Sequence, residues 1–220
     1  GSMISEGQAN ALVPVTTTTL LDSLQLSLPN ALNISRGEGI GRLYYRAALF
    51  VDRAADTAPA LNRGMEVSRS YYDADCEEDC APLTAAQLSA GAKVKVQVSV
   101  NLADDSYYVQ VEDFIPAGAE ILNQQLKTSE LGEEADSVEV YAPDNPFANG
   151  WGWWFFSDPQ IGDENITWSA DYLPAGTYVL NYTIIPLQAG EYRVLPAHAW
   201  QSFFPDVQGA SAGEVFVVRE

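Results

Sequence analysis

The sequence predicts an all-β fold, a Greek-key β-sandwich with extra strands at its N-terminus. Three observations support this: apolar and polar residues alternate in many short segments, clusters of Gly, Pro, Asn and Asp separate these segments, and helical patterns are weak. Alternation with a period of two places the apolar side chains on one face of a pleated strand. About ten short strands divided by turn residues are typical of a sandwich.

The clearest strand covers residues 94–102, in which Val and Leu alternate with polar residues. Residues 23–28 have the same period, and residues 41–51 form a long apolar segment rich in aromatic side chains. The weak helical pattern at residues 83–90 also fits a turn that leads into the 94–102 strand. We expect the remaining strands at residues 65–72, 107–113, 137–141, 153–157, 165–170, 176–185, 190–195 and 213–219.

The charge of the chain excludes two classes of partner. The sequence has 30 acidic and 11 basic residues, which gives a formal net charge of -19. Nucleic acids and anionic lipid surfaces are bound through clustered Lys and Arg, so neither is an expected partner. No apolar run approaches the roughly 18 residues that a membrane-spanning helix requires, so we expect no direct membrane insertion.

No catalytic motif stands out in the sequence. His198 is the one histidine, and no Gly-x-Ser-x-Gly nucleophile motif accompanies it. A hydrogen-bonded structural histidine is therefore the favoured interpretation. Carboxylates are numerous, but nothing in the sequence singles out a pair with the spacing of a glycosidase site. We predict that the chain is not an enzyme and that it has no cofactor.

Two cysteines, Cys76 and Cys80, lie in a short acidic segment. We expect a disulfide between them, while half of a metal site and two free thiols stay open as alternatives. Four ligands for zinc are not available, so no zinc site is expected. Calcium prefers carboxylate oxygens, and the weak candidates for it, set against a solvated acidic loop, are Asp73, Asp75, Glu77 and Asp79.

The most unusual stretch is the aromatic run at residues 149–156, which contains Trp151, Trp153 and Trp154. Tryptophans on a β-surface can form a platform for sugar rings or an anchor for a protein partner. Alternation sends only every second ring to one face, so a core strand is the competing interpretation. We treat the three tryptophans as the candidate binding surface.

Several segments, in order along the chain, resemble the C-terminal region of bacterial alpha-2-macroglobulin-like proteins. The most specific is Val-Glu-Asp-Phe-Ile-Pro-Ala-Gly-Ala-Glu at residues 111–120. The other segments that carry the resemblance are residues 39–45, 64–72, 88–96, 173–178, 189–196 and 204–209.

This resemblance implies a macroglobulin-type, immunoglobulin-like sandwich at residues 59–220. Residues 4–58 would then supply strands of a preceding CUB-like domain, and residues 1–3 are interpreted as a cloning scar. The family consists of large secreted or surface-anchored proteins that inhibit endopeptidases by trapping them after cleavage of a bait region. Their thioester motif, Cys-x-Glu-Gln, is absent here, because Cys76 precedes Glu-Glu-Asp.

The function implied by the resemblance is that of a non-catalytic C-terminal interaction domain. It would pack on the thioester domain of its parent and shield it, so its partners are the other domains of the parent and, indirectly, proteases. The implied location is extracellular, periplasmic or on the bacterial cell surface. The alternative function is a carbohydrate-binding or adhesin module that uses the aromatic cluster Trp151–Trp154.

Overall fold

The computed structural model divides the chain into two compact units, Gly1–Phe50 and Val51–Glu220, and each is described separately. None of the described residues forms a helix long and apolar enough to cross a membrane. The structure describes residues 16, 18, 31–35, 37–40, 42–50, 52, 54–76, 80–83, 88–122, 138–141 and 155–220.

In the first unit, the predicted strand at residues 41–51 is wrong over its described part, residues 42–50, which belong to no strand. The aromatic side chains there are exposed: Tyr44 by 83% and Phe50 by 90%. An extended segment becomes a strand only when a neighbour takes its backbone hydrogen bonds, and the apolar pattern does not reveal whether one exists. The predicted strand at residues 23–28 lies outside the described residues.

The described secondary structure of the second unit is formed by β-strands and begins with a short 3₁₀ helix, η1 (Ala55–Thr57). Its strands are β1 (Leu61–Arg63), β2 (Met65–Asp73), β3 (Leu88–Ser89), β4 (Val94–Leu102), β5 (Ser106–Phe114), β6 (Ala119–Ile121), β7 (Val138–Tyr141), β8 (Gln160–Ile161), β9 (Asn165–Leu173), β10 (Gly176–Pro186), β11 (Gly190–Val194), β12 (His198–Gln201), β13 (Gln208–Ala210) and β14 (Glu214–Arg219).

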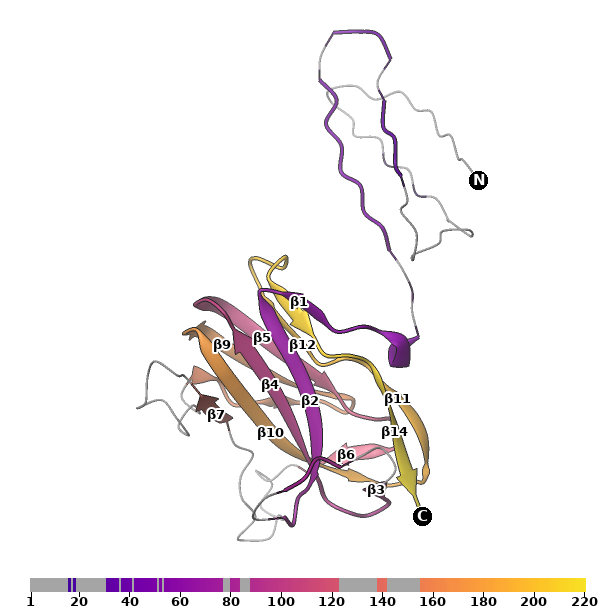
Figure 1. The fold of residues 1–220 in the computed structure, drawn as a ribbon, viewed down its shortest axis with the longest axis vertical. Helices are drawn as coiled ribbons and strands as arrows, with labels where there is room; N and C mark the ends of the chain where they lie inside the picture. Colours follow the sequence, from indigo (N-terminus) through magenta and orange to yellow (C-terminus); the bar gives the residue numbers. More distant parts are fainter. Residues whose placement is uncertain are drawn as a thin grey trace. The chain divides into compact units, whose positions relative to one another are not determined.

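These strands form three sheets (Figure 1). The first has the order β1-β13-β12-β5-β9-β8, and the second has the order β2-β4-β10-β6, with β7 also paired to β10. The third is small, with the order β11-β14-β3. All the pairs are antiparallel except β14 with β3 and the isolated bridge between Gly64 and Gln208.

The core lies between the first two sheets. In β4, every second residue from Val94 to Leu102 is buried, as the alternation predicts. Trp168 of β9 packs against Tyr182 of β10, with ring centroids 5.8 Å apart, so the inner faces of the two sheets meet here. The predicted β-sandwich is confirmed.

Two local predictions differ from the structure. Within the weak helical pattern, Leu88 and Ser89 form β3 instead, which pairs with β14. The predicted strand at residues 153–157 is wrong over residues 155–157, which lie outside any strand. There the rings of Phe155 and Phe156 pack edge-on against Tyr178, so the aromatic character reflects core packing.

Candidate functional site

One end of the sandwich carries a group of exposed aromatic rings, which we call the aromatic surface. The β4–β5 turn, the β9–β10 turn and the β12–β13 loop come together at this end (Figure 1). A backbone hydrogen bond of 2.9 Å from Ser202 N–H to the Tyr108 carbonyl ties the loop to β5. The exposed rings of the surface are Tyr107 (54%), Tyr108 (50%), Tyr172 (40%), Phe203 (70%) and Phe204 (66%).

Four of the five rings of the aromatic surface contact each other in two pairs. Tyr107 lies against its cross-strand neighbour Tyr172, with centroids 5.0 Å apart. Tyr108 meets Phe203 edge-on at 4.9 Å. Tyr108 also has a φ of 51°, the left-handed conformation that side chains other than glycine rarely adopt. Such backbone strain is concentrated at functional sites, so we take this end as the candidate site.

A carboxylate fixes the geometry at the edge of this surface. Asp105 accepts hydrogen bonds from the Tyr172 hydroxyl at 2.7 Å and from the Ala175 backbone N–H at 3.0 Å. These two hydrogen bonds lower the pKa of Asp105, because they stabilise its ionised form. The same contact raises the pKa of Tyr172. The β9–β10 turn is thereby tied to the β4–β5 turn, which contains Asp105.

A second polar cluster lies inside the sandwich and joins all three sheets. Arg69 of β2 contacts Asp113 of β5 through Nη1 at 2.5 Å and Glu214 of β14 through Nε at 2.6 Å. The Tyr182 hydroxyl donates to Asp113 at 2.7 Å, and the Tyr71 hydroxyl donates to Glu214 at 2.8 Å. The side chains of Arg69 and Asp113 are 1% and 0% exposed, so water screens this pair very little.

Burial shapes the ionisation of this cluster. Burial alone lowers the pKa of Arg69, but the carboxylate of Asp113 and the other neighbours outweigh it, and the net shift is upward. Burial also raises the pKa of Asp113, against the opposing effect of Arg69 and the Tyr182 hydroxyl. The pKa values of the Tyr71 and Tyr182 hydroxyls are strongly raised, and burial is the largest cause. The ion pairs and hydrogen bonds of the cluster link strands of all three sheets.

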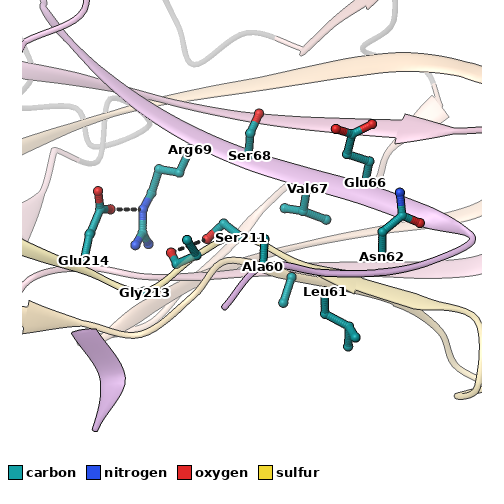
Figure 2. A pocket seen from close by; sticks show the side chains of 12 residues that line it. Ala60, Leu61, Asn62, Glu66, Val67, Ser68, Arg69, Ser211, Gly213 and Glu214 are labelled. Atoms are coloured by element: carbon teal, nitrogen blue, oxygen red, sulfur yellow. Dashed lines mark hydrogen bonds and ion pairs between the residues drawn. The ribbon is translucent and has the colours of Figure 1, made fainter. Parts of the chain in front are cut away.

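A cavity of about 440 Å³ opens beside Arg69. Its walls are the segment 60–62, residues 66–69 of β2, and the segment 210–214 that joins β13 to β14. Figure 2 shows the guanidinium of Arg69 between Glu214 and Ser211. The cavity therefore lies where the edge of the second sheet approaches the edge of the first.

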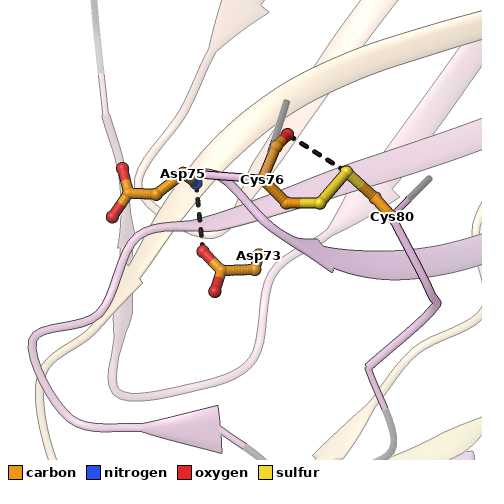
Figure 3. Close-up of a disulfide and its surroundings, with 4 residues drawn as sticks. All are labelled: Asp73, Asp75, Cys76 and Cys80. Carbon is orange, nitrogen blue, oxygen red and sulfur yellow. Dashed lines mark hydrogen bonds between the residues drawn. A yellow bond between two sulfur atoms is a disulfide. The ribbon is translucent and has the colours of Figure 1, made fainter. Parts of the chain in front are cut away.

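Cys76 and Cys80 form a disulfide directly after β2 (Figure 3). The Asp75 backbone N–H donates to the Asp73 carboxylate at 3.0 Å, so Asp73 caps the turn into this loop. The other two calcium candidates, Glu77 and Asp79, lie outside the described residues. Within the described part of the chain, no group of three or more His, Cys, Asp or Glu side chains could hold a metal ion.

The candidate binding residues Trp151, Trp153 and Trp154 also lie outside the described residues. His198 is described: its Nε2 lies 3.0 Å from the Gln208 side-chain oxygen, and its ring stacks on Trp200 at 4.8 Å. Neither contact provides a nucleophile.

Sequence reasoning missed the cluster around Arg69, although a signal was present. Asp113 follows Val109 and Val111 with a period of two, so it occupies an inward position on its strand. A charged residue at such a position requires a buried partner. The aromatic surface left a weaker signal, because its members come from three separate segments.

Comparison with known families places a large part of this chain in a family model. Residues 64–206, more than half of the chain, match the model described as the bacterial alpha-2-macroglobulin MG10 domain. Comparison with curated protein sequences gives no match.

Solved structures share the fold. Escherichia coli alpha-2-macroglobulin activated by porcine elastase aligns with a TM-score of 0.57 and 18% identity, over 74% of this chain and 14% of that chain. The native E. coli protein from domain MG7 to the C-terminus aligns with a TM-score of 0.55 and 16% identity, over 75% of this chain and 25% of that one. Salmonella alpha-2-macroglobulin reacted with methylamine aligns with a TM-score of 0.53 and 17% identity, over 74% of this chain and 10% of that chain. This chain thus matches only a small part of each relative.

Proposed function

This chain belongs to the family of bacterial alpha-2-macroglobulin MG10 domains, and we propose that it is a non-catalytic interaction domain of a larger protease-trapping protein. Its task is to pack on neighbouring domains of the parent and to shield the thioester domain. Proteases are partners only through the parent. The MG10 match over residues 64–206 supports the domain type, and the small share of each relative that is covered supports a larger parent.

The aromatic surface is the observation that carries this proposal. Five aromatic rings are 40% to 70% exposed at one end of the sandwich. Clustered aromatic side chains are characteristic of the buried centre of protein interfaces, because each ring removes a large apolar area from water at a small entropic cost. We therefore place the neighbouring domain of the parent against this surface.

The location we propose is outside the cytoplasm: extracellular, periplasmic or on the bacterial cell surface. The disulfide between Cys76 and Cys80 supports it, since such bonds form and persist in oxidising compartments. The formal net charge of -19 suits a soluble surface and does not favour anionic membranes.

Site-specific photo-crosslinking tests the proposed contact. A benzophenone amino acid replaces Phe203 in the intact parent protein, which is irradiated, digested and analysed by mass spectrometry. We expect cross-links from residue 203 to the thioester domain, because Phe203 is 70% exposed and lies on the aromatic surface.

The matched control places the same amino acid at Leu187, an apolar residue that is 54% exposed and follows β10 at the strand end away from the β9–β10 turn. This position should give few or no cross-links to the thioester domain. Equal cross-linking from both positions, or none from residue 203, would refute docking through the aromatic surface.

A further inference from the structure

Strand β2 is an edge strand. It pairs with β4 on one side along its whole length, from Met65 to Asp73. On its other side, the described residues that meet β2 belong to short pieces of chain. Gly64, just before β2, forms an isolated bridge with Gln208, and the Tyr71 carbonyl accepts a hydrogen bond from Leu83. Unpaired edges present backbone groups that can pair with another strand.

Contacts at the two ends of β2 show which of its backbone N–H and C=O groups point away from β4. The Tyr71 carbonyl points away from β4, because it accepts from Leu83 N–H at 2.7 Å. The Met65 carbonyl also points away, since a Cβ added to Gly209 would meet it at 2.1 Å. N–H and C=O groups of an antiparallel strand alternate between its two sides, so Val67 and Arg69 also direct theirs away from β4.

These outward groups have no hydrogen-bond partner among the described residues. The ends of β2 are covered by Gly209 and Leu83, so the unpaired window is Val67 to Arg69. This window forms one wall of the 440 Å³ cavity, whose volume falls within the range of typical binding pockets. The cavity thus lies along the stretch of edge that lacks a partner.

Arg69 supplies a second unsatisfied donor at this place. Its Nε and Nη1 are paired, but Nη2 is buried and has no hydrogen-bond partner in the described structure. A buried donor without an acceptor is destabilising, because it has lost its hydrogen bonds to water and has gained none in the protein. The cavity borders Arg69, but Nη2 has almost no accessible surface, so an acceptor oxygen that entered the cavity reaches this donor only when the guanidinium moves toward it.

The charges around the cavity decide which acceptor fits. The charge of Arg69 is already balanced by Asp113 and Glu214, and Glu66 on the cavity wall adds a further negative charge. A free anion would be repelled. A peptide carbonyl provides the acceptor without a charge, and basic side chains beside it would be attracted to Glu66 and Glu214.

We propose that this cavity binds an extended peptide segment of basic character, which adds as a short strand to the outer edge of β2. Main-chain hydrogen bonds to Val67 and Arg69 provide the affinity, as in other cases of strand addition. A carbonyl of the segment accepts from Arg69, and its Lys or Arg side chains lie near Glu66. This surface is separate from the aromatic surface, so either proposal can fail without the other.

The test uses the full chain and the capped hexapeptide Val-Lys-Val-Lys-Val-Lys, followed by NMR of the backbone amides. We expect the Val67 and Arg69 amide signals to shift and their hydrogen exchange to slow by roughly tenfold or more at saturation. The same peptide with N-methylated backbone amides cannot pair as a strand and should produce neither effect. The acidic peptide Val-Glu-Val-Glu-Val-Glu should also fail to bind.

Two matched pairs of variants locate the site. Ala212→Trp fills the cavity from its exposed wall and should abolish binding, whereas Ala90→Trp, at an exposed position away from it, should not. Glu66→Lys should weaken peptide binding at least severalfold. Glu120→Lys changes the net charge by the same amount and should leave peptide binding unchanged. Absence of any effect on Val67 and Arg69, or equal effects from the N-methylated peptide or from both members of a pair, would overturn the proposal.

Discussion

Two regions of the sandwich use tyrosine in opposite ways. Tyr182 and Tyr172 each donate a hydrogen bond of 2.7 Å to an aspartate, and both aspartates lie on or beside β5. Tyr182 is 1% exposed and belongs to the cluster that joins the sheets, whereas Tyr172 is 40% exposed and belongs to the aromatic surface. The same contact therefore stabilises the fold in one region and leaves a ring available for a partner in the other.

The buried region should tolerate substitution least. Asp113→Ala leaves the guanidinium of Arg69 with less compensation in the core, and we expect a loss of about 3–5 kcal/mol in the free energy of unfolding. Urea denaturation followed by tryptophan fluorescence measures it. The double variant Arg69→Met with Asp113→Leu removes both charges and should recover most of the loss. If Asp113→Ala unfolds at the wild-type urea concentration, the cluster is not a structural cross-link.

The two tyrosine hydroxyls provide the cleanest comparison. Tyr182→Phe leaves a buried carboxylate oxygen of Asp113 without its donor and should cost about 1–3 kcal/mol. Tyr172→Phe removes a hydrogen bond of the same length at the surface, where water replaces it, so no measurable change is expected. Both variants are compared by urea denaturation at neutral pH. Equal losses from the two would contradict the distinction between the regions.

Alkaline pH should also act through the buried tyrosines. Tyr71 and Tyr182 keep their protons to a higher pH in the folded chain than in the unfolded chain, where tyrosine titrates near pH 10. Above about pH 10 the folded state binds more protons, so the free energy of unfolding falls, by up to about 1.4 kcal/mol per pH unit for each tyrosine. Below that pH this contribution is constant.

Urea midpoints measured from pH 8 to 11 check this expectation. Tyr182→Phe should have a shallower alkaline decline than the wild-type chain, because one of the two groups is gone. A decline of equal slope in both proteins would show that Tyr182 does not contribute.

Removal of the disulfide should have a moderate to small effect. Replacing Cys76 and Cys80 with alanine releases a loop with a sequence separation of only four residues. Short loops restrict the unfolded chain less than long ones, so we expect a loss of at most about 2 kcal/mol. Thermal unfolding with and without a reducing agent measures it, and the reducing agent should not affect the alanine variant. A larger loss would mean that the loop supports β2 through further contacts.

The sequence predicted the sandwich well because alternation reports burial directly. The strand at residues 94–102 has the predicted bounds, and β2, β5, β9 and β10 differ from their predictions by a few residues at most. Short strands such as β12 and β13 were missed, since three or four residues show no clear period. Their formation depends on distant neighbours in the sheet: β12 pairs with β5, and β13 pairs with β12 and β1.

The candidate site was harder to predict, because it depends on distant contacts. Tyr107 and Tyr108 lie next to each other in a strand, and alternation alone would have buried one of them. The positive φ of Tyr108 and its contact with Phe203 are properties of the folded chain. The alternation of residues around Asp113 indicates its inward position from the sequence alone. Arg69, which is 44 residues away along the chain, could be identified as its partner only from the fold.

The most direct test of the account measures stability and binding in one variant. Phe203→Ser with Phe204→Ser should leave the urea midpoint unchanged, because both rings are exposed. If the chain docks on a thioester domain of its parent, as we propose, the same variant should bind that purified domain more weakly by about tenfold or more. Calorimetry provides the affinity, and the two serines leave the buried cluster intact. A variant that loses stability but binds like the wild-type chain would contradict the division between a buried structural region and an exposed functional one.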